Sequence, residues 1–159
     1  MSFVGIGYDS HRLAAGRALI IGGVRIESDR GLDGHSDADV LTHAVIDALL
    51  GAAALGDIGE HFPDTDARWR DADSICMLAD VVRTVRECGL EPVNLDCTVV
   101  MEAPKLGGHK ASIRRSLGLT LGIDEGRVNV KASTGEGIGF VGRGEGVAAL
   151  AIAALEPVA

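Results

Sequence analysis

The sequence predicts an α+β fold: a single-layer mixed β-sheet with about three helices on one face, in a ferredoxin-like arrangement. Two observations predict it. Short runs rich in β-branched residues alternate along the chain with segments whose apolar residues recur every three to four positions. The chain also has 159 residues, of which 47% are hydrophobic and 24% charged. That length and composition suit one domain spanning residues 1–159 with a substantial core.

The charge and cysteine content narrow the class of protein. The formal net charge is −8, whereas proteins that bind nucleic-acid backbones carry a basic face, so no nucleic-acid partner is expected. The three cysteines lack CxxC spacing, which argues against a disulfide framework and a cysteine-bound zinc. Neither a secretory signal nor a bilayer-spanning run is visible, so we expect a cytoplasmic protein without a membrane partner.

The first predicted strand, Phe3 to His11, ends in a D-x-H pair. Residues two apart in a strand share a face, so Asp9 and His11 can reach one ion, although a plain polar strand end reads the same way. The next segment, 18–27, consists of two β-branched runs around Gly22-Gly23. It predicts a hairpin with a two-residue turn, because both glycines tolerate positive φ.

A helix follows, which begins at about residue 36 and ends within the Ala-rich run between Gly51 and Gly56. Ser36 and Asp39 are expected to form a capping pair at its start. Asp39, His43 and Asp47 recur at i, i+4 spacing and form one polar stripe beside an apolar face. Such a stripe is either a solvated charge row or, if other segments supply partners for His43, part of a site.

The rest of the chain predicts further helices at 74–88 and 110–121, and strands at 93–101 and 127–133. Pro92 and Pro104 are expected to bound the first of these two strands. Periodicity leaves the Ala-rich segment 147–155 open between helix and buried strand. Asp57 is either a turn residue or a ligand contact. Helices on one face leave the other face of the sheet uncovered, so we expect an oligomer.

Three residues from distant segments form a candidate metal site. Asp9, His11 and His43 offer two nitrogen donors and one oxygen donor, which is the ligand set of an open, catalytic zinc. Asp47 is expected to accept the second N–H of the His43 imidazole. Thr134 and Glu136 follow a predicted strand and suit phosphate and a second, hard cation, and a loop carries Lys105 for phosphate or base.

Seven motifs together resemble the 2-C-methyl-D-erythritol 2,4-cyclodiphosphate synthase family of the non-mevalonate isoprenoid pathway. They occur in the family's order, from Asp9 to Gly146. They are GYDSHRL, IIGGVRI, HSDADVLTHAVIDALLGAAALGDIG, HFPDTD, MEAPKL, VNVKASTGEGIGF and GRGEG.

The resemblance implies a cyclising phosphorus-oxygen lyase. Its 4-diphosphocytidyl-2-C-methyl-D-erythritol 2-phosphate substrate attacks its own β-phosphate and releases CMP. Zn²⁺ would lie on Asp9, His11 and His43, and Glu136 would help to place Mg²⁺ or Mn²⁺. His35 and Thr134 would stabilise the transition state. The implied substrate contacts are Ser36, Asp57, Gly59, Phe62, Asp64, Asp66, Met101, Ala103, Pro104, Lys105, Leu106, Ala132, Ser133, Phe140 and Arg143.

The resemblance further implies a homotrimer with active sites between subunits. Arg143 would face the threefold axis above Phe140, where three arginines either bind an isoprenoid diphosphate or are neutralised by Glu145. Two other functions stay open: a zinc-dependent phosphohydrolase in which water is the nucleophile, and a non-catalytic trimer that binds isoprenoid diphosphates.

Overall fold

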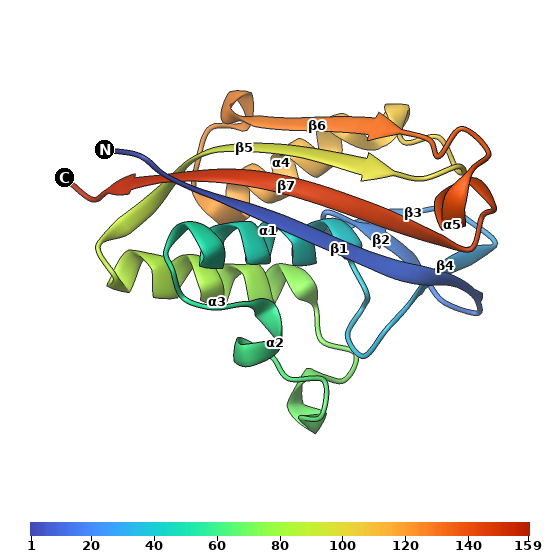
Figure 1. The fold of residues 1–159 in the computed structure, drawn as a ribbon, viewed down its shortest axis with the longest axis horizontal. Coiled ribbons are helices and arrows are strands. Elements are labelled where there is room, and N and C mark those ends of the chain that lie inside the picture. The colour runs from blue at the N-terminus through green and yellow to red at the C-terminus, as the bar shows by residue number, and fades with distance from the viewer.

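A five-stranded mixed sheet forms the backbone of the structure, a computed structural model that describes residues 1–159 (Figure 1). The strand order is β4 (Arg30–Asp33), β1 (Phe3–Ala15), β7 (Gly146–Pro157), β5 (Leu90–Val100) and β6 (Val128–Ser133). Neighbours are antiparallel except β5 and β6, which are parallel. A separate hairpin consists of β2 (Leu19–Ile21) and β3 (Val24–Ile26).

Three long helices pack on one side of this sheet (Figure 1). They are α1 (Val40–Ala52), α3 (Ser74–Glu87) and α4 (Lys110–Leu121). The loops contain two short helices, α2 (Ile58–His61) and α5 (Gly139–Gly142). Helix α1 is the most enclosed, because it packs on β1 and β7 and also against α3. It is therefore buried nearly all round, which brings its polar residues into the interior.

The other face of the sheet carries apolar side chains that nothing in the chain covers. On β1 and β7 the outward positions are 39–66% exposed, while the residues between them are buried. These outward residues are Val4, Ile6, Tyr8, Leu150 and Ile152. The expected uncovered face is present, and it lies on the two strands that pair at the centre of the sheet.

Glycine on β1 allows the first strand to lie directly against α1. A Cβ at Gly7 would stand 1.8 Å from the Ala44 carbonyl oxygen, and one at Gly5 would stand 2.1 Å from that of Ala48. Any side chain at these two positions would force the strand and the helix apart. This close approach brings Asp9 and His11, in the middle of β1 and not at its end as predicted, to His43 on α1.

The hairpin is anchored to the start of α1 through Asp39. Gly22 and Gly23 have φ of 58° and 76°, as the predicted two-residue turn requires. Their N–H groups donate to the two Asp39 carboxylate oxygens at 2.8 and 2.7 Å. The same carboxylate accepts from the backbone N–H and the hydroxyl of Thr42. Asp39 thus caps the helix and holds the hairpin while fully buried.

The structure corrects several expectations about the elements. Asp39 alone caps α1, and Ser36 lies outside the helix in the preceding loop. Pro92 lies inside β5, at a register shift, and does not bound the strand. The Ala-rich end of the chain is strand β7. Residues 30–33, for which no element was predicted, form the edge strand β4.

The ferredoxin-like arrangement is wrong. That fold has the order β-α-β-β-α-β, whereas here both α1 and α3 lie between β1 and β5, and two strands follow α4. The C-terminal strand β7 inserts between β1 and β5. Local periodicity does not specify such pairing, because it depends on contacts between the two ends of the chain.

Candidate metal centre and adjoining cavities

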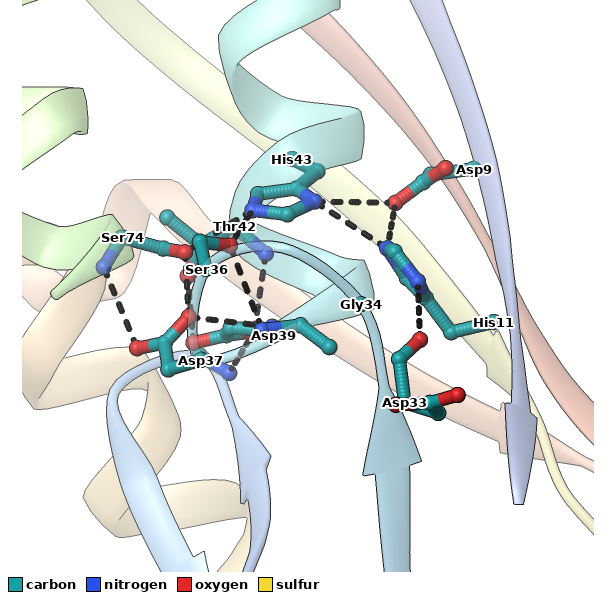
Figure 2. Close-up of polar contacts among 12 residues, drawn as sticks. Asp9, His11, Asp33, Gly34, Ser36, Asp37, Asp39, Thr42, His43 and Ser74 are labelled. Atoms are coloured by element: carbon teal, nitrogen blue, oxygen red, sulfur yellow. Dashed lines mark hydrogen bonds and ion pairs between the residues drawn. The ribbon is translucent and has the colours of Figure 1, made fainter. Parts of the chain in front are cut away.

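Asp9, His11 and His43 bring three donor atoms together at the junction of β1 and α1 (Figure 2). Asp9 Oδ2 lies 2.8 Å from His11 Nε2 and 3.1 Å from His43 Nδ1, and the two nitrogens are 3.2 Å apart. The three side chains are only 11–27% exposed. Burial disfavours ionisation of Asp9, but hydrogen bonds to His11 and His43 outweigh it and lower its pKa to about 2. The carboxylate is therefore ionised at neutral pH.

Both imidazoles are held from behind by hydrogen bonds. His11 Nδ1 lies 3.0 Å from the carbonyl oxygen of Asp33 on β4, which can only accept, so Nδ1 carries a proton and Nε2 faces Asp9. His43 Nε2 lies 2.8 Å from Ser74 Oγ and 3.1 Å from Ser36 Oγ. Each ring therefore points one nitrogen inward, toward the shared point between the three side chains.

This donor set fits a zinc ion. The nitrogen ligands of a tetrahedral zinc lie about 3.3 Å apart when each bond is about 2.0–2.1 Å. The three separations here are 2.8–3.2 Å, so about half an ångström of adjustment accommodates the ion. Three protein ligands beside a cavity also leave a position for a substrate oxygen. Of the two alternatives for the polar stripe on α1, the solvated charge row is excluded, because Asp39 and His43 are buried.

The expected role of Asp47 is wrong. Its carboxylate accepts from the backbone N–H of Ile58 at 2.8 Å, which ties α1 to the start of α2. The second nitrogen of His43 faces Ser74 and Ser36. The i, i+4 spacing placed Asp47 one turn from His43, but the ring is directed toward the start of the helix and not toward its end.

A cavity of about 440 Å³ opens beside the metal ligands, and we call it the His43 cavity. Among the expected site residues, it is lined by His11, His35, Ser36, His43, Gly59, Phe62 and Asp64. Trp69 and Met77, which the sequence did not indicate, also line it. Asp57 and Asp66 lie outside this lining. Asp57 caps α2 by accepting from Glu60 N, and Asp66 pairs with Arg68 and accepts from His35 Nε2 through its carbonyl.

A second cavity, of about 410 Å³, lies at the ends of β5 and β6, and we call it the Lys105 cavity. Its expected members are Met101, Pro104, Lys105, Leu106, Ala132, Ser133, Thr134 and Glu136. Lys110 also lines it, whereas Ala103 does not. Glu136 has a backbone φ of 54°, a value that residues other than glycine rarely adopt. Its N–H donates to the Thr134 hydroxyl, and Gly135 N donates to Glu102, so this turn is held from two sides.

The two cavities share no lining residue within one chain. His35 and Thr134, the two residues expected to stabilise a transition state, lie in different cavities. Phe140 lines a third, smaller hollow of about 150 Å³ with Arg12 and Glu145. Arg143 is exposed, and its Nε lies 3.0 Å from Glu145 Oε1.

Sequence reasoning missed three polar residues that do not line the His43 cavity but hold the residues that do. Ser74 and Asp37 form a chain of hydrogen bonds behind His43. The Arg17 guanidinium donates to the carbonyl oxygens of Leu32, Gly34 and Ser36 and so holds the loop that carries His35. Ser74 was identifiable only as a residue at a helix start, and no local pattern links it to a histidine 31 positions away.

Known proteins match this chain along nearly its whole length. The family model described as the YgbB family matches residues 2–156. The 2-C-methyl-D-erythritol 2,4-cyclodiphosphate synthase of Salinibacter ruber is 58% identical over 96% of this chain and 98% of its own. The synthase of that name from Desulfosudis oleivorans is 57% identical over 94% of this chain and 89% of its own.

Solved structures of related proteins have the same fold as this chain. A 2C-methyl-D-erythritol-2,4-cyclodiphosphate synthase in a CDP-bound form has a TM-score of 0.89 at 38% identity, covering 96% of this chain and 99% of that one. The bifunctional IspDF of Campylobacter jejuni has a TM-score of 0.95 at 44% identity, over 99% of this chain and 42% of that longer one. None of the helices here combines the length and apolarity that crossing a bilayer demands. The chain belongs to the YgbB family, and curated relatives of this chain are cyclising lyases named 2-C-methyl-D-erythritol 2,4-cyclodiphosphate synthase.

Proposed function

We propose that this chain converts 4-diphosphocytidyl-2-C-methyl-D-erythritol 2-phosphate into 2-C-methyl-D-erythritol 2,4-cyclodiphosphate and CMP. A 2-phosphate oxygen forms a bond to the β-phosphorus, and the bond from that phosphorus to the bridging oxygen breaks, so CMP leaves. The observation that carries the proposal is the converged Asp9–His11–His43 donor set beside a cavity, in a chain of this family. The reaction belongs to the non-mevalonate pathway of isoprenoid synthesis.

The site must join two anionic groups, so charge neutralisation and in-line positioning matter most. A zinc ion on the three ligands would supply positive charge to the β-phosphate, and a magnesium or manganese ion placed with the help of Glu136 would supply more. The strained backbone at Glu136 supports a functional position, since such strain persists where the surroundings enforce it.

The protein's own side chains would bind and orient the substrate. His35 and Ser36 line the His43 cavity beside the ligands, where they can contact phosphate oxygens. Gly59, Phe62 and Asp64 would bind the methylerythritol part. In the Lys105 cavity, Lys105 and Thr134 would contact phosphate, and the walls formed by Met101 and residues 104–107 and 132–134 would hold the cytidine.

We propose further that the protein is a homotrimer in which one active site joins the His43 cavity of one subunit to the Lys105 cavity of its neighbour. Two features support this arrangement. Within one chain the two cavities share no wall. The exposed apolar face of β1 and β7 also needs a cover, which a closed ring of identical chains provides. The proposed compartment is the cytoplasm, supported by three unpaired cysteines.

A phosphorus NMR time course with the natural substrate tests the proposed reaction. We expect signals of a cyclic diphosphate and of CMP to grow together. A phosphohydrolase would instead release CMP with a linear bisphosphate, because water replaces the 2-phosphate as the nucleophile. A linear product would therefore contradict the proposal and favour the hydrolase.

Binding of an isoprenoid diphosphate by Arg143 is the second candidate function. The ion pair of Arg143 with Glu145 favours the alternative in which the arginines are neutralised within each chain. A thermal-shift titration with geranyl diphosphate, run on the wild type and on Arg143→Ala, separates the two. A stabilisation that the substitution removes would support the ligand site, and equal responses would reject it.

A further inference from the structure

The wall behind His43 contains a chain of hydrogen bonds from Asp37 through Ser74 to the imidazole (Figure 2). Ser74 is the first residue of α3 and is fully buried. Its hydroxyl donates to Asp37 Oδ1, and its backbone N–H donates to Asp37 Oδ2 at 3.1 Å. Asp37 Oδ1 also accepts from the backbone N–H of Asp39. The Asp37 carboxylate is therefore held from both α1 and α3.

The direction of these bonds determines which nitrogen of His43 carries a proton. A carboxylate can only accept, so the Ser74 hydroxyl commits its single proton to Asp37. Its oxygen can then only accept at 2.8 Å from His43 Nε2. Nε2 must therefore carry the proton. In the neutral ring, Nδ1 then has a free lone pair, directed at Asp9 and His11.

We infer that Ser74 and Asp37 are positioning residues for the proposed zinc site: they hold His43 in the tautomer whose Nδ1 binds the metal. The inference rests on the proposed function, because it concerns the ion held by Asp9, His11 and His43. It assigns to these two residues the role that spacing suggested for Asp47.

A purely structural role does not account for the Ser74 hydroxyl. Helix α3 is already capped by Asp73, whose carboxylate accepts from Ile75 N at 2.9 Å. The link between α3 and Asp37 also persists without the hydroxyl, through the Ser74 backbone N–H. Ser36 Oγ, at 3.1 Å from Nε2, already accepts from Ala38 N, and its own proton is not committed to a carboxylate. Ser74 is therefore the residue that defines the tautomer.

The first test measures zinc affinity of the metal-free protein by competition with a chelator. Loss of a hydrogen-bonding partner behind a metal ligand typically costs 10–100-fold in affinity. We expect Ser74→Ala to bind zinc roughly 10–100-fold more weakly, Asp37→Asn to be weakened less because its amide oxygen can still accept, and Ser74→Thr to recover most of the affinity. Thr84→Ala is the matched control, since it removes a hydroxyl bonded only within α3.

The second readout uses cobalt(II) in place of zinc. Unpaired electrons shift the imidazole N–H protons of bound histidines away from other proton signals. We expect two such exchangeable signals, from His11 Nδ1–H, which bonds to Asp33, and from His43 Nε2–H. Ser74→Ala should accelerate solvent exchange of the second signal and leave the first unchanged. The His11 signal is thus an internal control for general loosening.

Three outcomes are decisive. Unchanged zinc affinity and unchanged N–H exchange in Ser74→Ala would overturn the inference while leaving the metal site intact. If Ser74→Ala does not fold, zinc affinity and N–H exchange are measured on Asp37→Asn instead. Values equal to those of the wild type would then overturn the inference. Wild-type protein that binds no zinc, or His43→Ala that binds it fully, would instead overturn the proposed metal site itself.

Discussion

The two cavities of this chain differ in how completely one chain builds them. In the His43 cavity the histidine side chains are buried or half-buried. Hydrogen bonds also hold them in place: Asp33 holds His11, Ser74 holds His43, and Arg17 holds the loop that carries His35. In the Lys105 cavity, Lys105 and Glu136 are exposed, and hydrogen bonds hold the backbone of the turn more than its charged ends.

The proposed function explains this difference, because the His43 cavity would bind a metal ion and the Lys105 cavity a nucleotide. A metal ion needs ligands that are already placed to within a fraction of an ångström. The close packing of β1 on α1 at Gly5 and Gly7, and the buried Asp39 carboxylate at the start of α1, fix the elements that carry these ligands. A nucleotide can be held by flexible cations and by walls that close around it. In the proposed enzyme, the His43 cavity, which we call the rigid half, would hold the metal, and the Lys105 cavity, which we call the open half, would be completed by the neighbouring chain of the trimer.

The largest expected effect comes from removing a ligand of the rigid half. His43→Ala should lose both bound zinc and turnover, because two remaining ligands are too few to retain the ion in an open site. Elemental analysis of the purified variant, beside a steady-state assay, checks both. A variant that keeps about one zinc per chain would break the assignment of His43 as a ligand.

A smaller effect should follow from the open half. Lys105→Ala should keep its zinc and lose roughly 10–100-fold in kcat/KM, the effect of removing a hydrogen bond to a charged group worth about 1.5–3 kcal/mol. Zinc content and kinetics measured on the same preparation separate the two halves. Loss of zinc in this variant would show that the two cavities are coupled within one chain and are not built separately.

The smallest effect is expected at Asp47. Because its carboxylate accepts from Ile58 N and does not contact His43, Asp47→Asn should change zinc affinity less than threefold, well below the roughly 10–100-fold expected for a partner of a ligand. Chelator competition run alongside Ser74→Ala gives the ranking directly. A larger loss in Asp47→Asn than in Ser74→Ala would reverse the roles assigned to these residues.

Local patterns predicted most of the elements. Helices α3 and α4 and the hairpin at Gly22-Gly23 lie where capping residues, apolar periodicity and glycine turns indicate them. The order of strands was not predictable in this way, because β7 pairs between strands that are distant in sequence. The Ala-rich segment has the same composition in a helix or a strand, and only its position in the sheet decides.

The candidate site was likewise predictable only in part. Residue type and spacing indicated Asp9, His11 and His43 as a ligand set, and the structure brings them together. The partner of His43 was assigned wrongly, because spacing along α1 pointed to Asp47 while the ring is directed across the loop to Ser74 on α3. Such partners depend on tertiary contacts, and no periodicity within one helix reports them.

In the proposed trimer, each active site joins the rigid half of one subunit to the open half of another. The direct test is to unfold His43→Ala and Lys105→Ala together at equal amounts, refold them and measure turnover. When trimers assemble at random from equal amounts, each interface receives an intact His43 half with a chance of one half and an intact Lys105 half likewise. Recovery of roughly a quarter of wild-type activity is therefore expected if the halves combine independently. Mixed trimers that are no more active than their parents would show that each site is built within one chain.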